Sequence, residues 1–170
     1  PVERWNPPFC GDIDMRIAAD GTWFYNGSPI GRHALVKLFS SVIRKDGADY
    51  FLVTPVEKLG IRVDDAPFQA VEMAVDGEGP ARRIVFRTHV DDLVPVDAEH
   101  RLCLERSAGG GLTPYVEVRR GLRARVTRAL AYDLLALGEI AETAEGPMFG
   151  VQAGGMFHAA VPADEIEGLA

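Results

Sequence analysis

This chain lacks several features that would assign it to a functional class. Its 170 residues include two cysteines, Cys10 and Cys103, which stand far apart and in no motif, so we expect free thiols and no disulfide. No apolar run reaches the roughly 18 residues of a membrane-spanning helix. The first residues show neither the basic nor the apolar segment of a secretory signal. We therefore expect a cytoplasmic protein with no membrane partner.

Catalytic signatures are also missing. The four histidines are scattered, without the spacing of metal ligands. The glycine run at residues 109–111 lacks the Lys and Ser/Thr that follow the glycines of a phosphate-binding loop. No nucleophile elbow is present. The sequence therefore favours a non-enzymatic protein with no cofactor, no metal and no catalytic residues.

Charge is unevenly distributed along the chain. The net charge of −7 argues against nucleic-acid binding. Residues 129–170 contain seven acids and no Lys or Arg, whereas five arginines fall within ten residues just before them: Arg119, Arg120, Arg123, Arg125 and Arg128. This cluster is the sharpest chemical signal in the chain.

The periodicity of apolar residues predicts an α+β fold. Residues 31–45 and 121–138 have helical spacing, and short apolar segments separated by turn residues indicate strands. The predicted strands are residues 15–18, 23–25, 50–53, 61–63, 70–75, 83–88, 100–104, 115–118, 148–151 and 156–161.

The same pattern indicates an internal duplication. An aromatic strand at Trp23, a glycine, and a helix opening with Arg32 have a weaker copy 91 positions later, at Tyr115 and Arg123. We therefore predict two related modules, residues 1–106 and 107–170, each with an antiparallel sheet and one packed helix.

The arginines at the two predicted helix starts have two interpretations. Basic residues are unfavourable at the positive end of a helix dipole, so Arg32 and Arg123 are candidates for binding a phosphate or carboxylate. Alternatively, their stems cover the core and their charges pair with acidic residues.

Two turns have similar alternatives. Thr54, Glu57 and Lys58 follow a buried strand and could form a polar pocket wall, or simply a turn that ends the strand. Gly154 and Gly155 could let the backbone approach a ligand, or form a tight turn between strands.

Nearly the whole chain resembles a known bacterial family, most specifically in its N-terminal module. The segment CGDIDMRIAADGTWFYNGSPIGR, followed by LVTPVEK and DAPF, is similar to Domain of Unknown Function 1285. The resemblance implies an internally duplicated α+β core whose C-terminal half superficially resembles pleckstrin-homology folds. It also implies a nucleotide-like ligand between the halves and a role in signalling or oxidative stress.

Our leading hypothesis is a regulatory protein that binds an anionic, nucleotide-like small molecule between its modules. Arg32 and Arg123 would hold the phosphates, and Tyr25, Phe68 or Tyr115 would stack on a base. Orientation would come from the other predicted residues: Thr54, Glu57, Lys58, Gly154 and Gly155. The alternatives are a module that binds a protein partner or a second copy of itself through a sheet edge, and a small hydrolase using Glu57.

Overall fold

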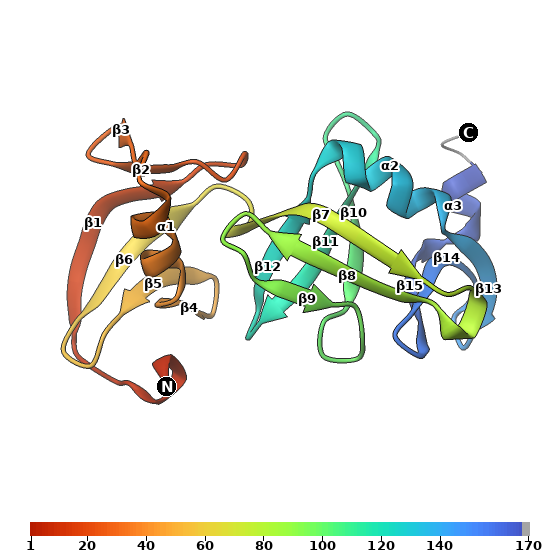
Figure 1. Cartoon of the computed structure of the whole chain (residues 1–170), viewed down its shortest axis with the longest axis horizontal. Helices are drawn as coiled ribbons and strands as arrows, with labels where there is room; N and C mark the ends of the chain where they lie inside the picture. The colour runs from red at the N-terminus through yellow and green to blue at the C-terminus, as the bar shows by residue number, and fades with distance from the viewer. Residues whose placement is uncertain (168–170) are drawn as a thin grey trace.

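The computed structural model describes residues 1–167, which form three β-sheets with the helices packed against them (Figure 1). Sheet A and its helix lie at one end of the molecule, sheet B lies in the middle, and sheet C lies at the other end. Sheet A and its helices comprise η1 (Val2–Arg4), β1 (Phe9–Ile17), β2 (Trp23–Tyr25), β3 (Ser28–Pro29), α1 (His33–Ser40), β4 (Ile43–Asp46), β5 (Asp49–Val53) and β6 (Lys58–Val63).

The rest of the chain forms sheets B and C. Sheet B comprises β7 (Phe68–Asp76), β8 (Arg83–Thr88), β9 (Leu93–Pro95), β10 (Leu102–Arg106), β11 (Leu112–Arg119) and β12 (Leu122–Val126), with η2 (Gly79–Ala81) between β7 and β8. Then follow α2 (Arg128–Ala136), β13 (Glu139–Thr143), β14 (Gly146–Ala153), β15 (Met156–Pro162) and α3 (Ala163–Glu167). Strands β13, β14 and β15 form sheet C.

Sheets A and B have the same topology. Read in matching directions, the strand orders are β3-β2-β1-β6-β5-β4 and β9-β8-β7-β12-β11-β10. Each sheet joins two antiparallel meanders through one parallel pair, which is β1 with β6 in sheet A and β7 with β12 in sheet B. The predicted duplication and α+β class are confirmed.

The predicted spacing of the repeat is wrong. β1 and β7 begin 59 positions apart, at Phe9 and Phe68, and β6 and β12 begin 64 positions apart, at Lys58 and Leu122. The spacing of 91 came from aligning the two helices. The helices do not occupy equivalent places, because α1 lies between the third and fourth strands of its sheet and α2 follows the sixth strand of the other.

Both predicted helices are too long at one end. Residues 122–126 form a strand in which Leu122, Ala124 and Val126 are buried and alternate with arginines. Leu122 and Val126 also fit a helical spacing of four, so the spacing of apolar residues alone could not distinguish a helix from a strand. Residues 43–45, predicted as the end of the first helix, belong to β4.

The boundary predicted near residue 107 lies inside sheet B. The loop at residues 107–111 connects β10 to β11. These two strands pair along their length, from Leu102 with Val116 to Arg106 with Leu112. The change from sheet A to sheet B falls between β6 and β7. We therefore describe an N-terminal module of residues 1–66 and a C-terminal module of residues 67–167. The pleckstrin-homology likeness of the C-terminal half stays a prediction.

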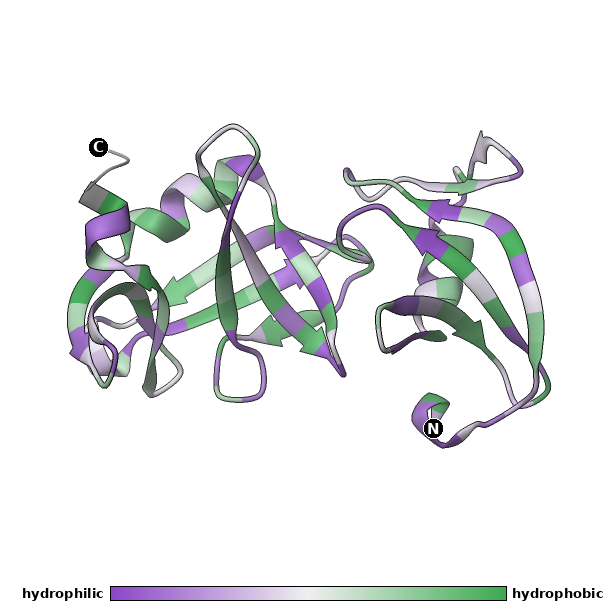
Figure 2. Cartoon of the chain, turned by 180° about the vertical axis from the view of Figure 1, so that it is seen from behind, coloured by the Kyte–Doolittle hydropathy of each residue, from purple (hydrophilic) through white to green (hydrophobic). Residues whose placement is uncertain are grey.

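One hydrophobic core runs through both modules. Hydrophobic and hydrophilic residues alternate along the strands (Figure 2), so each sheet buries one face. The largest fully buried side chains are Trp23 on β2, Phe68 on β7 and Phe86 on β8, and they belong to one continuous cluster. Within residues 1–167, no helix has the length and apolar character needed to cross a membrane.

Candidate functional site

The two arginines of the predicted site lie in different settings. Arg32 is exposed and precedes α1 as its N-cap residue. Arg123 lies within β12 rather than at a helix start, and its guanidinium donates to Glu105 at 2.7 Å and covers the Tyr115 ring at 4.1 Å. The prediction that Arg123 opens a helix is wrong, and its charge is already paired.

The aromatic candidates are separated as well. Tyr115 is buried, and its hydroxyl donates to the Asp65 carboxylate at 2.8 Å. Burial, together with that carboxylate, raises the pKa of Tyr115 to about 12. Phe68 is fully buried beneath Arg119, and Tyr25 is exposed on the short strand β2. Tyr115 and Phe68 are therefore not available to stack on a ligand, whereas the Tyr25 ring is accessible.

The predicted turn residues have structural contacts. The Thr54 hydroxyl accepts from the backbone of Glu57 at 3.0 Å, as expected of a strand-ending turn. Lys58 pairs with Asp46 at 2.8 Å. Gly154 and Gly155 form the turn between β14 and β15, where the Gly154 N–H donates to the Arg82 carbonyl.

The ten predicted residues therefore do not converge on one pocket. Several polar contacts cross the junction between the two modules. Arg119 donates to the Ser40 carbonyl at 2.6 Å, Gln69 donates to the Ala19 carbonyl at 2.9 Å, and Asp91 lies within 3.5 Å of Lys37.

One hollow at this junction is lined by both modules. It has a volume of about 390 Å³ and is formed by η1 and the segment after it, by β4, and by the turn between β11 and β12. Its lining residues are Glu3, Trp5, Asn6, Arg44, Lys45, Asp46 and Arg120. We call it the junction cavity.

Arg44 organises the junction cavity. It is half-buried, and it bonds both carboxylate oxygens of Asp46 at 2.9 Å. It also donates to the Trp5 carbonyl at 2.6 Å and to the Val2 carbonyl at 3.3 Å. Hydrogen bonds from Arg44 and Lys58 hold the pKa of Asp46 below its usual value. Arg44 therefore links the N-terminal segment to β4, and the negative charge of Asp46 is paired with two cations.

The remaining charges leave the cavity with a positive excess. Arg120 pairs with Glu3 at 3.1 Å, where both groups are substantially exposed. Lys45 lies over the Tyr50 ring at 5.4 Å, and in the part of the chain that the structure describes it has no carboxylate within salt-bridge distance. Three cations and two carboxylates line the cavity, and Lys58 adds a further positive charge next to Asp46.

Arg120 has a strained backbone. It forms a two-residue turn with Gly121, and both residues have positive φ, 46° and 79°. This turn favours Asn-Gly, because an ordinary side chain in this left-handed region costs about 1 kcal/mol or more. An exposed ion pair such as Arg120–Glu3 returns only about 0–1 kcal/mol. Folding stability alone therefore does not explain an arginine here.

Sequence reasoning missed most of the cavity. Trp5 and Asn6 stand in the Pro-rich lead-in, which carries no periodic pattern, and Lys45 was assigned to a helix end. Arg120 was within the arginine cluster that the charge pattern identified. The dipeptide Arg120-Gly121 between two apolar segments was the signal that could have located the turn.

Each of the two modules matches a domain model of the same protein family. Residues 1–66 match the model described as "Domain of unknown function (DUF1285), N-terminal domain", and residues 67–160 match the model "Protein of unknown function (DUF1285), C-terminal domain". The chain belongs to the DUF1285 family. The resemblance noted in the sequence is thus confirmed, and the junction of the two family models coincides with the change from sheet A to sheet B.

Two solved structures of DUF1285 proteins resemble this chain. One, from Silicibacter pomeroyi DSS-3, is 48% identical with a TM-score of 0.91, over 98% of this chain and 90% of that protein. The other, from Shewanella baltica OS155, is 28% identical with a TM-score of 0.57, over 72% of this chain and 90% of that protein. No curated protein matches the chain. The comparisons thus assign a family and a fold but no activity.

Proposed function

We propose that this DUF1285 protein is a non-enzymatic regulatory protein that binds a small, anionic, nucleotide-like molecule in the junction cavity. The observation that carries the proposal is Arg120, which keeps a strained backbone at a turn where asparagine would be relaxed. Strain of this kind is typical of functional sites. It is explained if the guanidinium binds an anion.

The cavity offers the groups that such a ligand needs. Arg120 and Lys45 would hold a phosphate by charge-assisted hydrogen bonds. Trp5 supplies an aromatic ring for a base, and Asn6 supplies an amide that can both donate and accept. A volume of about 390 Å³ is within the range of small-molecule pockets.

Binding in this cavity would regulate how the modules are held together. Arg120 belongs to the C-terminal module, and the other lining residues belong to the N-terminal module. A bound anion would bridge the two and stabilise their docked arrangement. Such stabilisation of the docked modules would be the physical basis of the signalling or stress role that the family resemblance implies. We place this role in the cytoplasm, where the exposed thiols of Cys10 and Cys103 would stay reduced.

The test is a titration with AMP and with inorganic phosphate at low salt, monitored by Trp5 fluorescence and thermal unfolding. At 100 times its dissociation constant, a ligand adds about 2.7 kcal/mol of stability, which raises Tm by several degrees. Arg120→Asn should abolish this shift. It should leave the free protein as stable as before or slightly more so, because asparagine suits the turn.

Arg83→Gln is the matched control. Arg83 is an exposed arginine on β8 that pairs with Asp76 and does not line the junction cavity, so its loss should leave the ligand-dependent shift intact. An equal shift in Arg120→Asn and in the wild type would contradict the proposal. Flat titrations with both probes would also contradict it, and would favour a protein partner at a sheet edge.

A further inference from the structure

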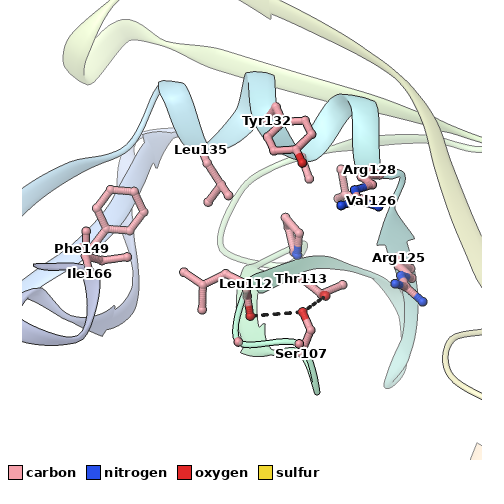
Figure 3. A pocket seen from close by; sticks show the side chains of 15 residues that line it. Ser107, Leu112, Thr113, Arg125, Val126, Arg128, Tyr132, Leu135, Phe149 and Ile166 are labelled. Atoms are coloured by element: carbon pink, nitrogen blue, oxygen red, sulfur yellow. Dashed lines mark hydrogen bonds between the residues drawn. The ribbon is translucent and has the colours of Figure 1, made fainter. Parts of the chain in front are cut away.

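A second hollow lies entirely within the C-terminal module. It is a groove of about 1070 Å³ between the β10–β11 hairpin and α2, and it extends to β14 and α3 (Figure 3). None of the residues that line the junction cavity lines this groove. The two hollows are therefore independent of each other.

The floor of the groove is apolar. Pro114, Val126 and Ala131 are buried beneath it, and Leu112, Leu135 and Phe149 are half-buried and face it. Figure 3 places Leu135 between Phe149 at one end and the arginines at the other. Apolar surface kept partly open to water in this way gains free energy when a hydrocarbon group covers it.

The two ends of the groove differ in chemistry. Phe149 and Ile166 form one end, and Arg125 and Arg128 form the other (Figure 3). Between the ends, the hydroxyls of Ser107 and Thr113 bond to each other at 2.8 Å. The groove is therefore amphipathic along its length.

The charge at the basic end is not balanced within the groove. Among the described residues, the lining includes two arginines and no carboxylate, although the chain as a whole carries a net charge of −7. Arg125 shares its charge with Asp65 at 3.3 Å, whereas Arg128 forms no ion pair with residues 1–166, whose side chains the structure describes. Arg128 is also the first residue of α2, so the helix dipole adds to the positive potential there.

From this pairing of an apolar floor with one basic end, we propose that the groove binds a single-chain amphipathic acid. Its anionic head group would contact Arg128 and Arg125, and its hydrocarbon chain would lie over Leu112 and Leu135 toward Phe149. A head group bound this way forms charge-assisted hydrogen bonds, and the chain replaces water over the floor. The volume of the groove suits a molecule of this size.

The test is calorimetric titration of the whole protein with dodecanoate and dodecyl phosphate below their critical micelle concentrations, and with dodecanol below its solubility limit. Both acids should bind at one site at least tenfold more tightly than the alcohol, and acetate should not bind. A preference for only one of the acids would identify the head group. Equal affinity for acid and alcohol, or no binding by either acid, would overturn the proposal.

Two variants separate the head group from the chain. Arg128→Gln should weaken dodecanoate binding about tenfold and leave dodecanol binding unchanged. Leu135→Asn should weaken both, with retained folding checked by circular dichroism. Arg83→Gln, outside the groove, is the charge-matched control. An unchanged dodecanoate affinity in Arg128→Gln would refute the assigned basic end. Both tryptophans, Trp5 and Trp23, lie in the other module, so a fluorescence change that is lost in Trp5→Phe would assign binding to the junction cavity instead.

Discussion

Sheets A and B have one strand order but obtain their helices from different places in the chain. In sheet A, α1 lies in the connection between β3 and β4. In sheet B, the corresponding connection between β9 and β10 has no helix, and α2 follows β12 instead. This difference indicates that the duplicated unit is the six-stranded sheet with its central parallel pair. The helix that covers each sheet is a separate addition.

Sheet C packs against the β9–β10 connection, which has no helix in the C-terminal module. Gly154, in the turn between β14 and β15, lies directly against the backbone of Val96 and Asp97 in the β9–β10 connection. Strand β15 contacts β10, and the His158 side chain on β15 accepts from the Leu102 N–H at 3.3 Å. The β9–β10 connection thus packs against sheet C, whereas the corresponding connection in sheet A contains a helix.

The largest expected effect tests whether the two copies fold as one unit. Phe86→Ala removes a fully buried ring from β8 and should cost about 3–5 kcal/mol. Because one core cluster joins both modules, we expect a single unfolding transition at a lower denaturant concentration. Both tryptophans, Trp5 and Trp23, are in the N-terminal module, so their fluorescence reports on the copy that was not mutated.

The reciprocal change is Trp23→Ala on β2, the strand that corresponds to β8. It should lower the midpoint measured by circular dichroism over the whole chain by a similar amount. If the modules were independent, Phe86→Ala would leave the fluorescence midpoint unchanged while the dichroism curve split in two.

A smaller effect is expected where sheet C docks. Gly154→Ala places a methyl group against the Val96 carbonyl oxygen in a backbone with φ of 62°. We expect a loss of about 2–3 kcal/mol in the free energy of unfolding. Gly155→Ala is the matched control, because Gly155 also has a positive φ but open space around it. Its cost should be only about 1 kcal/mol; equal costs would show that the contact with Val96 is not important.

The smallest effect is a dependence of stability on acid pH that comes from the C-terminal module. His158 is buried, and burial lowers its pKa below 6.5. The unfolded chain therefore takes up a proton before the folded chain does. The contribution of His158 is complete above pH 6.5 and is lost as the pH falls from 6.5 through the lower folded pKa, by at most about 1.4 kcal/mol per pH unit.

Denaturant unfolding between pH 7.5 and 5 measures this dependence. His158→Asn keeps an acceptor for the Leu102 N–H but cannot be protonated, so the slope should fall. Burial also lowers the pKa of His89, and the slope should fall further when His89→Asn is added. A slope that neither variant changes would assign the acid sensitivity to other groups.

The sequence predicted the class of fold and the existence of a duplication, but not the register of the copies. Turn residues and alternation located most strands, because these signals are local. The register failed at residues 122–126, where buried Leu122 and Val126 satisfy both a helical and a strand pattern. Residues 122–126 form a strand because they pair with β7, about 55 residues earlier in the chain.

The candidate site was less predictable than the fold. The arginine cluster was found from its charge, yet the arginine chosen from it, Arg123, is paired with Glu105, and Arg120 lines the junction cavity instead. Trp5 and Lys45 reach that cavity through contacts between segments more than 70 positions from Arg120. No local pattern records such a contact.

The sequence by itself determined most of the strands, the repeated use of one sheet and the positive character of residues 119–128, because each depends on residue type and short spacing. Only the tertiary structure decided which arginines are neutralised, which helix covers which sheet, and where two hollows remain. The physical reason is that ion pairs and cavities depend on which side chains meet across the core. Those meetings are set by the packing of the two modules as a whole.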